Sequence, residues 1–181
     1  MDQKEYEHFY EEITIKAVTD TVTMLLKYPF GFHGDTGIRD YLYARLHVHG
    51  DETLNVDGPS PKDSILLLQS EHYTRNKHKN PNKADEKGRF DLALTLPPKP
   101  EAGTEDGYAE NLDALFAFEL GKNKRPKGVI DPEMVNHATT TNPGRSDITK
   151  LWLELKDHKL MQGWAIEFYN NGETGAIKAR N

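Results

Sequence analysis

The sequence predicts an α/β domain in which a central mixed sheet is flanked by helices and preceded by an N-terminal helical pair. Two segments with the apolar period of a helix open the chain, and three short apolar segments between loops follow them. A further helical segment then precedes a last strand. We therefore expect one domain over residues 1–181, with helices in residues 1–50 packed on a core formed by residues 60–181.

Two helices are predicted at the start of the chain. Asp2 and Glu5 have the spacing of a capping box. Apolar residues then recur with helical period over residues 3–27. A second helix, capped at Asp35 or Thr36, carries apolar side chains at the same spacing: Ile38, Tyr41, Leu42, Ala44 and Leu46. The apolar faces of both helices suit packing on a sheet, and a dimer surface is the alternative.

Three strands are predicted in the middle of the chain. Residues 50–63 are polar and rich in glycine, proline and aspartate, which indicates a loop before the first strand, Ser64–Tyr73. Arg89–Leu96 alternates and places four apolar residues on one face: Phe90, Leu92, Leu94 and Leu96. Leu112–Leu120 is apolar almost throughout, which is typical of a central strand.

The last part of the chain is predicted to contain a helix and one or two strands. Residues 126–145 look irregular, and a helix then opens at Ser146 and Asp147 and ends at Gly163. Residues 164–169 form a strand, and residues 175–179 suit another. Two tryptophans among apolar neighbours are expected in the core: Trp152 and Trp164.

Composition excludes several classes of protein. The chain has no cysteine, so it has no disulfide, thiolate metal site or cysteine nucleophile. No apolar run approaches the ~20 residues of a membrane span, and the first residues lack the apolar region of a secretory signal. We expect a cytoplasmic protein without membrane contact. A net charge of -6 argues against coating nucleic acid through bulk electrostatics.

Basic residues are nevertheless concentrated in two short stretches. The first contains Arg75, Lys77, Lys79, Lys83, Lys87 and Arg89. The second contains Lys122, Lys124, Arg125 and Lys127, with no acid among them. Stretches of this kind contact phosphates in nucleic-acid-binding proteins, and two solvated loops are the alternative.

Three acids lie on or beside the predicted strands: Glu71, Asp91 and Glu119. Carboxylates amid apolar strands are expensive to bury unless they are paired or bound to a metal. Two acids on adjacent strands suit Mg²⁺, and Lys122 at the end of the strand suits a role in activating water. Glu71 joins them if its strand extends that far. Alternatively, Asp91 pairs with Arg89, and Glu119 pairs with Lys122 or Lys124.

Two segments resemble the PD-(D/E)xK nuclease superfamily: Gly88–Leu94, with an aspartate after Gly-Arg, and Ala117–Leu120, which closes the next strand. About residues 60–170 follow the order of elements in that core. The resemblance implies a restriction-endonuclease-like fold that binds Mg²⁺ or Mn²⁺. It assigns the metal to Asp91, Glu119 and the backbone carbonyl of Leu120, and it implies a catalytic lysine.

The lysine departs from the family pattern. It normally stands two residues after the glutamate, where this chain has Gly121. Lys122 comes one residue later, and Lys124 is a further candidate. A bulge at Gly121 would restore the position of Lys122. If the lysine is lost instead, the protein cuts slowly or not at all.

These observations predict a metal-dependent nuclease that hydrolyses phosphodiester bonds, with DNA rather than RNA as the substrate. Asp91, Glu119 and Lys122 would be catalytic. The alternative is an inactive nuclease fold that binds nucleic acid or a protein, as a homodimer or as a subunit of a larger assembly. A carboxylate-pair glycosidase would leave the basic stretches without a role.

Overall fold

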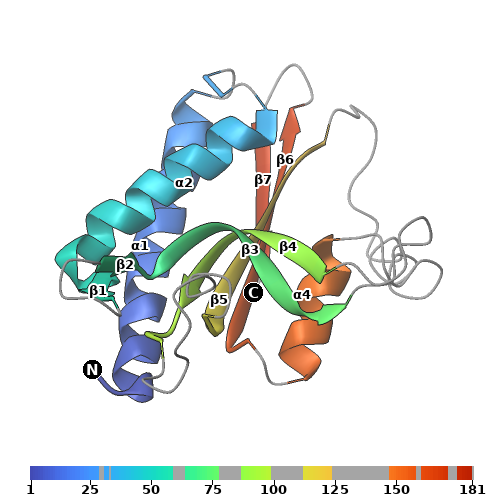
Figure 1. Cartoon of the computed structure of the whole chain (residues 1–181). Helices are drawn as coiled ribbons and strands as arrows, with labels where there is room; N and C mark the ends of the chain where they lie inside the picture. The colour runs from blue at the N-terminus through green and yellow to red at the C-terminus, as the bar shows by residue number, and fades with distance from the viewer. Residues whose placement is uncertain are drawn as a thin grey trace.

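The computed structural model describes residues 1–28, 31–32, 34–58, 64–77, 87–98, 112–123, 147–157, 160–170 and 175–180. Helices α1 (Gln3–Lys27) and α2 (Gly34–Gly50) lie side by side against a five-stranded sheet, and α4 (Asp147–Lys156) lies apart from them beside the other strands (Figure 1). Among the described residues, none of the helices has both the length and the hydropathy of a membrane span.

The large sheet has the strand order β3-β4-β5-β6-β7. Its strands are β3 (Leu68–Lys77), β4 (Lys87–Thr95), β5 (Ala114–Asn123), β6 (Gln162–Asn170) and β7 (Gly175–Arg180). Among the described strands, β5 and β6 pair in parallel and the other neighbours pair antiparallel, so the sheet is mixed. The α/β class, the mixed sheet and the central place of β5 are confirmed.

The first helix forms as its sequence predicts. The side chain of Asp2 accepts a hydrogen bond from the amide of Glu5 at 2.9 Å, and the carboxylate of Glu5 accepts from the amide of Asp2 at 2.6 Å. These two bonds satisfy amides that the helix itself leaves without partners. One side of α1 is buried through Tyr6, Tyr10, Ile13, Thr14, Ala17, Val18, Thr21 and Leu25.

Two hydrophobic clusters lie on the two faces of the sheet. The helix-pair cluster joins α1 and α2 to β4 and β5, and it includes Leu42, Leu46, Leu92, Leu94, Phe116 and Phe118. The α4 cluster consists of Phe90, Ala93, Ala114, Ala117, Leu151 and Leu160. Side chains that alternate along β5 supply both clusters, which places α1 and α2 opposite α4. Packing of the two N-terminal helices on the sheet is confirmed.

Two expectations for the segment after α2 are wrong. Residues 50–63 are not all loop, because Asp51–Leu54 forms a 3₁₀ turn and β1 (Asn55–Asp57) pairs with β2 (Ser64–Leu66). The predicted strand Ser64–Tyr73 is two strands that belong to different sheets. Strand β1 has one apolar residue in three positions, which is too short a pattern to reveal alternation.

The expectations for the last helix are partly wrong. It ends at Lys156, and Gly163 lies in β6, where an added Cβ would come within 3.2 Å of the Leu151 side chain. Trp164 is buried as predicted, but Trp152 is 50% exposed and stacks against the ammonium of Lys156. Strands β6 and β7 match their predicted positions. The irregular residues 126–145 lie outside the described residues.

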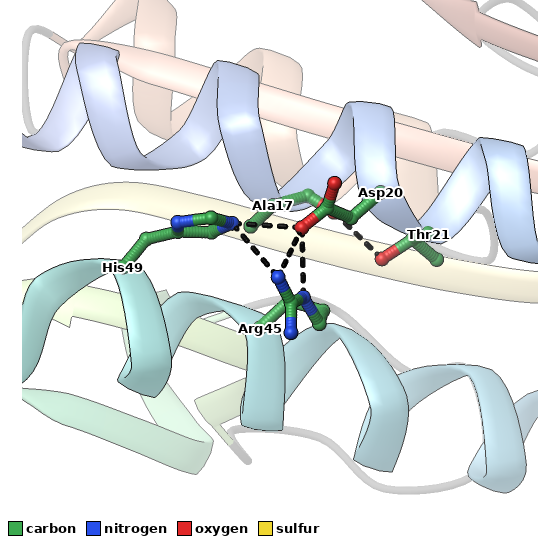
Figure 2. Close-up of polar contacts among 5 residues, drawn as sticks. All are labelled: Ala17, Asp20, Thr21, Arg45 and His49. Atoms are coloured by element: carbon green, nitrogen blue, oxygen red, sulfur yellow. Dashed lines mark hydrogen bonds and ion pairs between the residues drawn. The ribbon is translucent and has the colours of Figure 1, made fainter.

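A polar cluster joins the two N-terminal helices where they face each other (Figure 2). One carboxylate oxygen of Asp20 on α1 accepts from Nε of Arg45 at 2.8 Å and from Nε2 of His49 at 2.8 Å, and both donors are on α2. The hydrogen bonds from His49 and then from Arg45 hold the pKa of Asp20 below its usual value. The cluster therefore fixes how the two helices are aligned.

Tyr10→Phe tests a hydrogen bond that ties α1 to the sheet. The hydroxyl of the buried Tyr10 donates to the carbonyl of Thr95 at 2.6 Å, and the variant leaves that acceptor without this donor. We expect the free energy of unfolding in urea to fall by about 1–2 kcal/mol. Tyr43→Phe, at a half-buried tyrosine of α2, should change it much less. Equal losses in the two variants would contradict the assignment.

Asp20→Asn should lower the free energy of unfolding by about 1 kcal/mol or less at neutral pH, because its partners are partly exposed. Since folding lowers the pKa of Asp20, this contribution is complete above the ordinary pKa of 3.8. It is lost as the pH falls through the lower, folded value. Thermal unfolding from about pH 7 to about pH 2 should show the variant and the wild type converging in acid. Asp57→Asn, at an exposed aspartate, should follow the wild type throughout.

Candidate functional site

Strands β4 and β5 bring Asp91 and Glu119 together. The register pairs Leu92 with Phe118, so Asp91 and Glu119 are the next residues along the two strands. The Oδ2 atom of Asp91 accepts a hydrogen bond from the amide of Leu120 at 2.7 Å. The carboxylate of Asp91 therefore lies beside the peptide bond that joins Glu119 to Leu120. We call Asp91 and Glu119 the acidic pair.

The two strands separate at the acidic pair. Among the described residues, the β4–β5 ladder ends at Leu92 and Phe118. Strand β5 continues with β6 as far as Asn123, and β4 continues with β3 as far as Lys87. Figure 1 shows β3 and β4 curving toward α4 while β5 runs alongside β6. Beyond the end of the regular ladder, the side chain of Asp91 accepts a hydrogen bond from the amide of Leu120.

The apolar alternation of β4 also changes at Asp91. The sequence places Phe90 on the same face as Leu92 and Leu94, which is wrong. Leu92 and Leu94 lie in the helix-pair cluster, whereas Phe90 lies in the α4 cluster. A strand that curves away from its neighbour no longer keeps one face toward one layer, and the sequence pattern alone does not contain this bend.

Glu119 is buried in the middle of an apolar strand. Its side chain is 3% exposed, and Phe118 and Leu120 on either side belong to the helix-pair cluster. Ala117, two residues earlier, belongs to the α4 cluster, so alternation puts Glu119 on the α4 face. A carboxylate at such a depth needs polar or cationic partners to offset its desolvation.

The backbone of Leu120 is oriented toward the same place. In a strand, the N–H and C=O of one residue point toward the same neighbouring strand. Since the Leu120 amide is directed at Asp91, its carbonyl is directed toward β4 as well. The Asp91 carboxylate and the Leu120 carbonyl, two of the oxygen ligands that the resemblance implies, therefore lie on the β4 side of β5, next to the strand position of Glu119.

Glu71 stands in the same register row but binds a different partner. It lies between the pairs Ser70–Leu92 and His72–Phe90, which places it next to Asp91 across β3 and β4. Its backbone is left-handed, with a φ of 54°, and its Oε1 lies 2.5 Å from Nη1 of Arg39 on α2. The structure thus brings together the acidic pair, while the carboxylate of Glu71 reaches the helix pair.

The Arg39–Glu71 ion pair offsets part of the cost of this backbone conformation. A left-handed conformation at a residue other than glycine costs about 1–2 kcal/mol. The two side chains are 27% and 48% exposed, and such pairs contribute about 0–1 kcal/mol. Non-glycine residues held in this region cluster at functional sites.

Arg89 is held against Tyr73 on the neighbouring strand. Its guanidinium lies 4.5 Å from the centre of the Tyr73 ring, and its Nη2 donates to the Tyr73 hydroxyl at 2.5 Å. The two residues are register partners on β3 and β4, and Arg89 is exposed. Arg89 therefore presents a positive charge two residues from Asp91.

Lys122 does not gain the position that the family motif requires. The β5–β6 register runs without a shift from Phe116 to Asn123, so the bulge at Gly121 that would have restored the position of Lys122 is not formed with β6. Lys122 remains opposite Phe168, three residues after Glu119. Positions an odd number apart on a regular strand fall on opposite faces. The position on the face of Glu119 is that of Gly121.

The remaining predicted basic residues are only partly placed. Lys77 and Lys87 are register partners near the end of the β3–β4 ladder, and Arg75 lies in β3. Only their backbones are described. Five of the predicted basic residues lie outside the described residues: Lys79, Lys83, Lys124, Arg125 and Lys127.

Sequence reasoning missed Glu154, which is 1% exposed on α4. The signal was its spacing, because it follows the buried Leu151 by three residues and shares its helix face. It missed His72 also, which is buried in β3 with Nε2 3.1 Å from the carbonyl of Leu112. Among the described residues, no group of three or more histidine or acidic side chains is arranged to hold a metal ion.

Comparison with known proteins gives no match: neither a protein-family model, nor a curated protein, nor a solved structure matches the chain.

Asp91→Ala and Asp91→Asn test the hydrogen bond at the point of separation. Alanine removes the acceptor of the Leu120 amide, and we expect the free energy of unfolding in urea to fall by about 1–2 kcal/mol. Asparagine keeps a carbonyl oxygen at the same position and should lose about half as much or less. If both variants lose the same amount, Asp91 does not hold the strands through this bond.

Proposed function

We propose that this protein is a metal-dependent nuclease that hydrolyses phosphodiester bonds in DNA, built on a restriction-endonuclease-like core. The observation that carries the proposal is the 2.7 Å hydrogen bond from the Leu120 amide to Asp91, because it sets the aspartate beside Glu119 where β4 and β5 part. The sequence resemblance assigns its two motif acids to these residues.

The order of elements supports the same proposal. Strands β3, β4 and β5 form an antiparallel meander, α4 follows, and β6 returns parallel to β5. That is the order predicted from the resemblance. A parallel return through a helix places the ends of β5 and β6 at the same edge of the sheet. The acidic pair lies on the central strand and its neighbour.

The residues present fit a divalent cation of the Mg²⁺ type. Mg²⁺ takes oxygen ligands, usually one or two carboxylates, and keeps several positions for water and phosphate. Asp91, Glu119 and the carbonyl of Leu120 supply such oxygens. When bound, the ion supplies Lewis-acid activation of the water and the phosphate. We include no histidine in this set, because Mg²⁺ prefers oxygen.

The protein's own residues have separate tasks in this proposal. The buried Glu119 gives a carboxylate fixed by packing, and Asp91 gives one fixed by the Leu120 amide. Arg89, exposed and held against Tyr73, contacts a phosphate next to the scissile one. The basic residues around residues 75–89 and 122–127 bind the DNA backbone through further phosphates.

One observation favours a second candidate function, a nuclease fold that binds nucleic acid or a protein without efficient cleavage. The unshifted β5–β6 register leaves Gly121 at the position of the family lysine. A glycine supplies no group to orient the attacking water or to neutralise charge on the phosphate. Cleavage would then be slow, although metal and DNA still bind.

The deciding experiment incubates linear, supercoiled and single-stranded DNA with the protein in Mg²⁺, Mn²⁺ or EDTA. We expect cleavage that requires the metal and falls by about a hundredfold or more in Asp91→Asn and in Glu119→Gln. Glu12→Gln is the matched control, because Glu12 is an exposed acid on α1 that pairs with Lys16. It should cleave like the wild type.

The outcomes separate the two candidates. Metal-dependent cleavage that survives in both acidic-pair variants would overturn the assignment of the site. No cleavage, with DNA binding that weakens as salt is raised, would favour the binding module. Neither cleavage nor salt-sensitive binding would reject nucleic acid as the partner.

A further inference from the structure

We propose that Arg39 and Glu71 form a clamp that positions Asp91 for the reaction. The ion pair holds Glu71 in its left-handed conformation, and that conformation turns the strand beside Asp91 so that its carboxylate meets the Leu120 amide. The catalytic use of the clamp rests on the proposed function, whereas its effect on the position of the Asp91 side chain does not.

The distortion of β3 and that of β4 occur in one register row. Ser70 pairs with Leu92 and His72 with Phe90, so Glu71 and Asp91 lie opposite each other with no residue gained on either strand. At Glu71 the backbone is left-handed, and on either side of Asp91 the side chains pass to different hydrophobic clusters. The coincidence indicates one local turn of both strands.

The clamp is anchored on the helix pair. Ile38 and Leu42 flank Arg39 on α2 and are buried in the helix-pair cluster, so the helix is a fixed support. Arg39 places Nη1 2.5 Å from Oε1 of Glu71 and Nε 3.7 Å from Asp40. A glutamate does not favour positive φ by itself. An external contact is therefore needed to hold it there, and Arg39 supplies one.

Glycine offers a direct test, because it adopts positive φ without steric cost. Arg39→Met removes the ion pair but keeps the bulk of the side chain. If the clamp acts through the backbone of Glu71, adding Glu71→Gly to Arg39→Met restores the turn without the ion pair. A purely electrostatic or packing role of Arg39 predicts no such restoration.

The readout is hydrogen exchange of the Leu120 amide, followed by NMR, which does not depend on activity. In Arg39→Met we expect exchange about threefold to fivefold faster, toward the rate in Asp91→Ala. The double variant Arg39→Met/Glu71→Gly should return it to within about twofold of the wild type. The other amides of β5 should stay unchanged in every variant.

Arg45→Met is the matched control. It removes an ion pair of similar exposure from the same helix, but its partner is Asp20 on α1 and not a residue of the sheet. It should leave the exchange of Leu120 unchanged. The clamp is overturned if Arg39→Met leaves this exchange unchanged, or if the double variant exchanges as fast as Arg39→Met alone.

A parallel cleavage series separates failure of the clamp from failure of the proposed function. If DNA is cleaved, kcat should fall in Arg39→Met and recover in the double variant, with little change in KM. If the wild type does not cleave, the proposed nuclease fails, and the exchange series still decides whether the clamp positions Asp91. Cleavage by the wild type with unchanged Leu120 exchange in Arg39→Met overturns the clamp alone.

Discussion

The fold around the candidate site depends on how β4 leaves β5. A regular antiparallel ladder would satisfy the amide of Leu120 with a backbone carbonyl of β4, but the ladder stops at Leu92 and Phe118. A backbone amide left without a partner is costly, and the carboxylate of Asp91 takes the missing place. One side chain thus ends the pairing of two strands and gains a fixed position. The local geometry of a candidate metal ligand is set by a backbone requirement.

The two faces of the sheet have different roles around the point where β4 and β5 separate. On one face, α1 and α2 bury a large apolar cluster with β4 and β5, which fixes the strands before they part. On the other face, the smaller α4 cluster is built largely from alanines of β4 and β5 and from leucines outside them. The helix-pair cluster supports the site, since a group held by packed strands keeps a more constant position than one on a loop. Glu119 lies on the face of the α4 cluster, and its strand, β5, contributes residues to both clusters.

Sequence reasoning recovered the elements whose signals are local. The capping box of α1, the apolar run of β5 and the alternation of β4 as far as Leu92 each act within a few residues. The neighbouring strand positions of Asp91 and Glu119 also followed, because both stood out as acids on apolar strands. The failures involve contacts distant in sequence: the carboxylate of Glu71 meets Arg39, which lies 32 residues earlier, and β1 pairs with β2 in a sheet of its own. The buried Glu154 and the exposed Trp152 were missed because helical spacing does not say which layer covers which side.

In the proposed function, binding a metal and using it are separable tasks. The oxygens that suit a divalent cation come from Asp91, Glu119 and Leu120, which lie where the strands part, and none of them requires a lysine. Handling the proton of the attacking water does require a further group, and the motif position for it is Gly121 in an unshifted strand. A nuclease and an inactive relative would thus share the fold, the acidic pair and the phosphate contacts. They would differ only in whether another basic residue reaches the water. The difference between the two proposed functions is therefore one side chain and not a different architecture.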